Sequence, residues 1–325
     1  VLHWTSSDER VLTVSSSGMI TAHTPGTATV TVTTNAQPKL TASCTVTVTE
    51  VPDLSLNALV YSPDGGSYWA QFNVRQPGSW QSLSEKQRSY AAGGFLNGMI
   101  YTHDGQNAYA IDPETFNAEF VAGLTTAQLW SDATAAPLTS GGAFGMLATT
   151  AASGTKLQLI DMEAKKISSA LLGLSFNVDP MAVLAYSHEG VHSVPPFGDF
   201  PAEFFYGMTE SGKLYRIEYY NALGGYSLAE PVLLAETGLT LTGVSQVNGS
   251  AYASLHFDSA SGYLFLSRYT EGNVAELFAI DPETGYVTKL GNFGADVWPV
   301  VSLFAYDRAA QPQLQLSRTQ AEMFV

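Results

Sequence analysis

Apolar and polar residues alternate along the first fifty positions, and this pattern predicts β-strands. Alanine or valine alternates with threonine in residues 28–33, and cysteine or valine alternates with threonine in residues 44–49. A period of two places the two sets of side chains on opposite faces of a sheet. We therefore expect residues 1–50 to form part of a β-sandwich, with Cys44 as a small core side chain.

A longer repeat covers residues 54–306. Five segments share an apolar strand that ends in Asn, Asp or Glu: residues 69–73, 108–112, 157–161, 214–218 and 277–281. Four intervals span 208 residues, an average of 52, within the range of a four-stranded propeller blade with variable loops. The repeat predicts a five-bladed β-propeller, with six blades as the alternative. We expect the strand in residues 298–306 to close a blade shared with the first strands of the repeat.

Composition supports this all-β prediction and excludes some partners. Only 13% of the 325 residues are charged, whereas 45% are hydrophobic. The formal charge of -15 opposes binding to phosphate backbones or anionic lipid. No apolar run approaches the roughly 18 residues of a membrane helix. We expect neither nucleic-acid binding nor membrane insertion.

The first unit also carries a resemblance to a known family. The segments Trp4–Asp8, Val14–Ala22 and Pro25–Val32 occur in the order of the second half of a bacterial Ig-like domain of group 2. This module is repeated in invasin- and intimin-type surface proteins. The resemblance implies that the first strands of the domain precede Trp4. Residues 308–325 resemble such opening strands, either of a further Ig-like domain or of one completing residues 1–50 in the same or a neighbouring chain.

Two turns resemble a feature of bacterial propellers. The sequences Asp112-Pro113-Glu114-Thr115 and Asp281-Pro282-Glu283-Thr284 are similar to strand-ending turns of quinoprotein-like and other repeat propellers. Asp accepts local N–H bonds and Pro fixes φ, so the turn itself accounts for both residues. The resemblance implies a fold and no particular activity.

The run His188-Glu189-Gly190-Val191-His192 matches the H-E-x-x-H zinc pattern. That chemistry needs a helix, which places both imidazoles on one side of the metal. Gly190 and the prolines at 195 and 196 oppose a helix here. We expect an exposed loop, with a metal site at His188 and His192 as the alternative.

Acidic and aromatic residues recur where one blade leads into the next. They are Trp130, Asp132, Asp179, Asp296 and Trp298. Carboxylates that converge at the propeller mouth hold calcium or recognise a cationic or hydroxylated ligand, and aromatic rings stack on sugars. The alternative is that each carboxylate caps its own turn.

These patterns favour an extracellular or cell-surface binding or adhesion protein without a cofactor. Ig-like modules would space the propeller from the cell, and the propeller would present a ligand site. The expected partner is a glycan, a host or cell-surface protein, or another copy through strand exchange. Two alternatives stay open: a repeat unit of a surface filament, and a propeller enzyme acting on polysaccharide or using zinc.

Overall fold

The structure is a computed structural model that describes residues 2–48, 50–62, 65–124, 130–137, 144–150, 156–167, 172–173, 181–222, 225–241, 246–247, 250–270, 272, 274–295, 297 and 299–306. These residues are mainly strands, and their one helical segment is a 3-10 turn at Pro77–Ser79. The all-β fold class is therefore confirmed. The chain divides into two compact units, Val1–Pro52 and Asp53–Val325.

The first unit contains a three-stranded sheet and a hairpin. The sheet has the order β1 (Leu2–Ser6), β4 (Gly26–Thr34) and β5 (Thr41–Val48), and the hairpin pairs β2 (Leu12–Val14) with β3 (Ile20–Ala22). Valine and alanine from β4 meet the hairpin in a small core of Val11, Leu12, Ala28 and Val30. Threonines on the other face form hydroxyl pairs between β4 and β5, such as Thr31 with Ser43 at 2.8 Å. The alternating sequence thus supplies one packed face and one hydrogen-bonded face.

Cys44 does not occupy the core, so that expectation is wrong. It pairs with the buried Val30 in the β4–β5 register, yet its side chain is exposed. The small core is formed by four buried residues, and β5 contributes only the partly buried Val46 and Val48 to it. Alternation identified the face on which Cys44 lies, but burial depends on what covers that face.

The described part of the second unit contains five sheets of four or five strands. The first is β9 (Ala92–Leu96), β10 (Met99–His103), β11 (Asn107–Ile111) and β12 (Ala118–Gly123). The second is β13 (Trp130–Pro137), β14 (Phe144–Thr150), β15 (Lys156–Asp161) and β16 (Lys166–Ile167), with β17 (Leu172–Gly173) on β15. The third is β18 (Met181–Val194), β19 (Gly198–Thr209), β20 (Lys213–Ala222) and β21 (Gly225–Leu228), with β22 (Val232–Glu236) on β20.

The fourth sheet is β25 (Ala253–Asp258), β26 (Tyr263–Tyr269), β27 (Ala275–Ile280) and β28 (Val287–Asn292). The fifth combines β29 (Val300–Phe304) with β6 (Ser55–Tyr61), β7 (Ser67–Asn73) and β8 (Gln81–Ser82). A short pair, β23 (Gln246–Val247) and β24 (Ser250–Ala251), accompanies them. The five repeated sequence segments lie in β7, β11, β15, β20 and β27, the third strand of each sheet.

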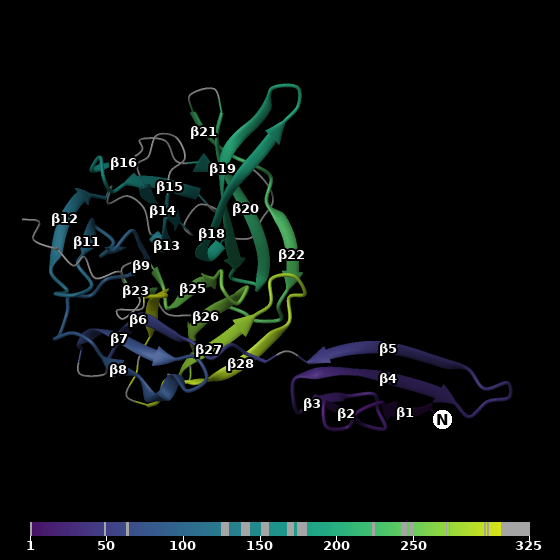
Figure 1. Ribbon diagram of the computed structural model, residues 1–325. Helices are drawn as coiled ribbons and strands as arrows, with labels where there is room; N and C mark the ends of the chain where they lie inside the picture. Colours follow the sequence, from purple (N-terminus) through teal and green to yellow (C-terminus); the bar gives the residue numbers. More distant parts are fainter. Residues whose placement is uncertain are drawn as a thin grey trace, which may run out of the picture. The chain divides into compact units, whose positions relative to one another are not determined.

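The first strands of these sheets form a closed ring. Contacts run from β9 to β13, β18, β25 and β29, and then from β29 back to β9. The ring closes because β29, from the end of the unit, pairs antiparallel with β6 from its start, with Val300 opposite Val60. This arrangement of radial sheets around an axis is propeller-like (Figure 1).

Large apolar side chains fill the space between neighbouring sheets. One cluster joins β6, β7 and β29 to β10 and β11 and includes Leu59, Trp69, Ile100 and Ile111, all fully buried. Another joins the third and fourth sheets through Leu214, Leu264 and Leu266. Burial of these faces fixes the first strands around the axis.

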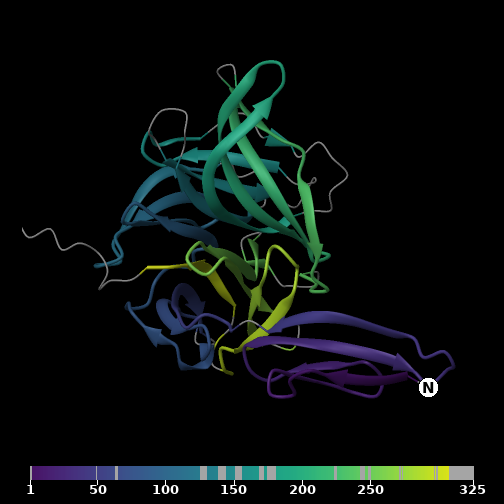
Figure 2. The same cartoon turned by 45° about the vertical axis from the view of Figure 1, so that its right-hand side comes forward.

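The third sheet differs from the others in length. Its first two strands have 14 and 12 residues, whereas β9, β25 and β29 have five or six. The added residues form a long hairpin that projects in both views (Figures 1 and 2). This hairpin contains His188 and His192.

Candidate functional site

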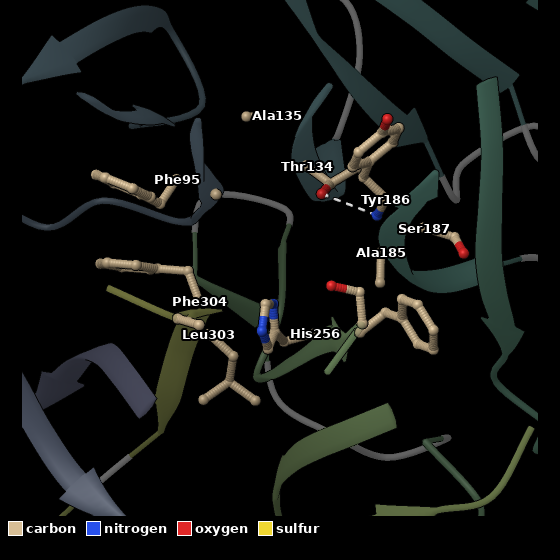
Figure 3. Close-up of a pocket in the computed structure, with 13 residues that line it drawn as sticks. Phe95, Thr134, Ala135, Ala185, Tyr186, Ser187, His256, Leu303 and Phe304 are labelled. Carbon is tan, nitrogen blue, oxygen red and sulfur yellow. Dashed lines mark hydrogen bonds between the residues drawn. The ribbon is translucent and has the colours of Figure 1, made fainter. Parts of the chain in front are cut away.

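A pocket lies on the axis of the second unit, where the first strands of all five sheets meet. Its volume is about 170 Å³. It is lined by Gly94, Phe95, Thr134, Ala135, Ala185, Tyr186, Ser187, His256, Phe257, Ser259, Leu303, Phe304 and Ala305 (Figure 3). These residues come from β9, β13, β18, β25, β29 and the positions just after β25 and β29. The lining comes from five separate stretches of the sequence, and the closed ring of first strands brings these stretches together.

The pocket has an aromatic side. Phe95 and Phe304 stack with ring centroids 6.0 Å apart and planes 17° apart, and both line the pocket (Figure 3). Behind them, Trp69 meets the Phe304 ring edge-on at 5.9 Å, and Tyr306 contacts Phe95 at 4.8 Å. The supporting rings restrict the rotamers of the two phenylalanines, so this wall is preformed.

His256 is the imidazole of the pocket and lies amid its labelled residues in Figure 3. Its Nε2 atom is buried and has no hydrogen-bond partner among the described residues. Burial lowers the pKa of His256 to about 4, against a smaller opposing effect of Asp258. The ring is therefore neutral at pH 7, with one donor and one acceptor nitrogen.

Hydrogen bonds between β13 and β18 hold the opposite wall. The Tyr186 N–H donates to Thr134 Oγ1 at 3.2 Å, and the Leu184 N–H donates to Asp132 Oδ2 at 2.8 Å. Two side chains of one strand thus accept from alternate amides of the next, on the edge of β18 that faces away from β19. These bonds satisfy amides that would otherwise be left without strand partners.

Asp132 lies two residues before Thr134 on β13, about 7 Å along the strand. Its side chain is 1% exposed, and its Oδ1 atom has no partner among the described residues. Burial raises the pKa of this carboxyl well above its usual value, against the opposing effect of the N–H bonds from Leu184 and Ala133. Asp132 is thus a structural acceptor for β18, set apart from the pocket lining.

The other residues predicted for the propeller mouth are placed less fully. Trp130 begins β13, and the structure describes its backbone only. Asp179, Asp296 and Trp298 lie outside the described residues. Their roles stay predictions. In the sequence each of these residues lies before or at the start of a first strand, whereas the pocket lining includes the ends of β25 and β29.

His188 and His192 lie on β18 in the long hairpin, where the sequence predicted a loop rather than a helix. Four residues of strand separate their Cα atoms by about 13 Å. His188 stacks on Phe204 with centroids 4.7 Å apart, and His192 bonds Glu218 at 2.8 Å. Over the described ranges, no three His, Cys, Asp or Glu side chains are grouped to hold a metal ion.

The sequence patterns did not indicate the residues that line the pocket. His256 stands between Leu255 and Phe257 in a strand whose alternation indicates burial, but nothing local marks it as facing an axis. The one available signal was its position near the end of a first strand. That position indicates a site only once the five first strands are known to surround one axis.

Comparison with known proteins gives a family match for the first unit. Residues 2–46 match the family model of the bacterial Ig-like domain (group 2). The resemblance of the first unit is thereby confirmed. No curated protein sequence matches the chain.

Several solved structures are similar at low identity. A protein assigned as a 6-phosphogluconolactonase from Bacteroides fragilis is 14% identical, covers 79% of this chain and 99% of its own, and has a TM-score of 0.36. The calcium-binding protein regucalcin from Agrobacterium tumefaciens is 13% identical, covers 74% and 75%, and scores 0.36. A mutant of AofleA from Arthrobotrys oligospora is 9% identical, covers 88% and 84%, and scores 0.36. At these scores the likenesses carry no argument about this chain.

The first unit therefore contains an Ig-like module, and the second is a propeller-like ring with an axial pocket. Within the described ranges, no helix is long and apolar enough to cross a membrane.

Proposed function

We propose that this protein is an extracellular binding protein of a bacterial surface, which holds a small uncharged ligand in the axial pocket. The observation that carries the proposal is the chemistry of the pocket lining. All thirteen residues are uncharged side chains or glycine, apart from His256, and burial keeps that imidazole neutral at pH 7.

The uncharged lining favours an uncharged ligand. A charged ligand would lose its hydration in the pocket without an opposite charge among the lining residues, and that transfer is costly. A neutral ligand with one or two polar groups instead finds aromatic walls together with hydroxyl and imidazole groups. Pockets that combine apolar walls with a few convergent polar atoms are typical of small-molecule sites.

The Ig-like module supports the extracellular part of the proposal. Residues 2–46 match a bacterial Ig-like family, and the resemblance seen in the sequence is to modules of surface proteins. The composition agrees, because a charge of -15 keeps a displayed protein soluble and away from phosphate polymers. In this proposal the module spaces the binding unit from the cell.

Ligand-observed NMR on the full chain tests the binding proposal. The probes are three matched sets of single-ring compounds: uncharged, cationic and anionic. We expect binders in the uncharged set, and their loss in Ser259→Trp, because Ser259 is exposed at the pocket rim and a bulky ring there blocks entry. Binding confined to a charged set, or binding that Ser259→Trp leaves intact, would contradict the proposal.

A second experiment tests the location. Antibody raised against residues 2–46 is applied to intact cells of the source bacterium and to lysed cells. Labelling of intact cells supports surface display, and labelling only after lysis would contradict it.

A further inference from the structure

We propose that the ligand of the axial pocket is the terminal sugar residue of a glycan, bound as a single uncharged ring. This inference rests on the proposed function and names the ligand class for the same site. Four properties of the pocket lead to it: its size, its charge, the partner that His256 lacks, and its closed outline.

Size limits the ligand to one ring. The pocket volume of about 170 Å³ is close to that of an engineered cavity of about 150 Å³ that binds benzene. It is smaller than the roughly 300–1,000 Å³ of sites for drug-sized ligands. A six-membered ring with small substituents fits, whereas a disaccharide exceeds the space.

Charge and wall chemistry select among single rings. The uncharged lining disfavours acidic sugars and amino sugars with a free ammonium group. The stacked pair Phe95 and Phe304 offers an apolar wall, and a sugar ring presents C–H groups on one face. The pocket also contains the hydroxyls of Thr134, Ser187 and Ser259, which match a ring with hydroxyl groups at its edge.

His256 supplies the most specific argument. Its buried Nε2 atom has no partner among the described residues, and leaving a buried nitrogen unpaired costs free energy. A purely apolar ring would leave that cost in place. A sugar hydroxyl both donates and accepts, so it satisfies Nε2 in either tautomer of the neutral imidazole.

The outline of the pocket favours a chain end. First strands of five sheets surround the axis, so the interior of a polysaccharide has no open groove to pass through. Neighbouring strands of the wall also leave no gap between them: a Cβ added at Gly94 of β9 would lie 3.0 Å from the Ala135 nitrogen of β13. A terminal residue enters such a pocket from one side, while the rest of the glycan stays outside.

The test uses the full chain and isothermal titration at pH 7. The sugar probes are methyl glycosides of uncharged sugars: glucose, galactose, mannose, fucose, xylose and the two common N-acetylhexosamines. The sugar-free probes are uncharged single rings of similar size, such as phenol, benzamide and cyclohexanol. We expect at least one glycoside to bind, and to bind more tightly than every sugar-free ring.

Two variants link binding to the pocket. His256→Leu removes the imidazole and should weaken glycoside binding at least tenfold. His103→Leu is its matched control, because His103 also has a buried, unpartnered Nε2 and lies outside the pocket. Ser259→Trp, at an exposed position, should abolish binding without touching the core.

The outcomes separate the two proposals. If sugar-free rings bind in a manner that Ser259→Trp abolishes, and no glycoside does, the sugar inference fails while the proposed binding function stands. If no probe of either class binds, the proposed function fails and the inference fails with it. Equal weakening by His256→Leu and His103→Leu would overturn the role given to His256.

Discussion

Two ionisable groups near the axis, the half-buried His256 and the buried Asp132, respond to desolvation in opposite ways. Burial lowers the pKa of His256 to about 4 and raises that of Asp132 well above its usual value. In each case desolvation penalises the charged form, which is the protonated form of histidine and the deprotonated form of aspartate. At the axis, burial therefore acts to remove charge of either sign.

The two groups differ in their partners. One oxygen of Asp132 accepts the Leu184 N–H at 2.8 Å and so completes the edge of β18. The other oxygen of Asp132 and the Nε2 atom of His256 are both buried without a partner among the described residues, but only His256 lines the pocket. The comparison separates a polar group that holds neighbouring strands together from one that lines the axial pocket.

The largest expected effect is the loss of stability in acid through His256. Its folded pKa of about 4 lies below the unfolded value of 6.5, so the unfolded chain binds more protons between these values. Stability from this group is complete above pH 6.5 and is lost as the pH falls towards 4, by about 3 kcal/mol. Urea unfolding between pH 7 and pH 4 should show a smaller loss in His256→Gln. An identical loss in the variant would contradict neutral burial of His256.

His103 provides an independent check on the same physics. It is fully buried, its pKa is lowered to about 4, and its Nδ1 accepts the Gly105 N–H at 3.1 Å. We expect His103→Gln to reduce the acid loss by about as much as His256→Gln. Because the residues lie in different sheets, the two reductions should add in the double variant.

The second largest effect concerns the hydrogen bond from Leu184. Asp132→Ala leaves that buried amide without its acceptor and should destabilise the unit by about 2 kcal/mol at pH 7. Asp132→Asn retains an acceptor oxygen of similar shape and should cost less. Urea unfolding of both variants measures the difference, and an equal cost would show that the hydrogen bond contributes nothing.

The pH dependence of Asp132→Asn sharpens the comparison. Since the folded pKa of Asp132 is raised, the folded chain binds more protons once the pH exceeds about 4. The native protein should therefore lose stability from this carboxyl as the pH rises towards the folded pKa, the opposite sign to His256. Relative to the native chain, Asp132→Asn should become more stable with rising pH. A relative stability that falls with pH would contradict a raised pKa.

The smallest effect is expected away from the axis, where His192 of the long hairpin meets β20. Glu218 accepts from His192 at 2.8 Å and from Arg216 at 3.1 Å, and the Arg216 side chain is 43% exposed. Solvent screens the ion pair between Arg216 and Glu218, so Glu218→Gln should cost about 1 kcal/mol or less. Thermal unfolding gives the value, and a cost above that of Asp132→Ala would reverse the expected ranking of the two regions.

The sequence predicted the strands better than the packing between them. Alternation of small apolar residues and threonine in residues 28–33 predicted the two faces of β4, and the repeated segments predicted the all-β fold. These signals are local, because side-chain period and turn chemistry belong to neighbouring residues. The exposed Cys44 shows the limit, since its burial depends on the covering layer rather than on its own strand.

The candidate site could not be predicted in this way. His256, Phe95 and Phe304 are separated by tens to hundreds of residues and meet only because the ring closes. The zinc pattern at His188 shows the converse, as residues adjacent in sequence are spread along a strand. Cross-strand register, which pairs His188 with Phe204, is set by tertiary packing.

Closure of the ring by β29 and β6 has a mechanical consequence. The two strands are antiparallel, and Phe304 near the end of one lies opposite Asn57 near the start of the other. A tension applied to the second unit at residues 54 and 305 would act at the same end of this strand pair. It would peel the pair apart one hydrogen-bonded step at a time instead of shearing all steps together. Because Leu303 and Phe304 form part of the pocket wall, peeling β29 from β6 would open the axial pocket on its β29 side.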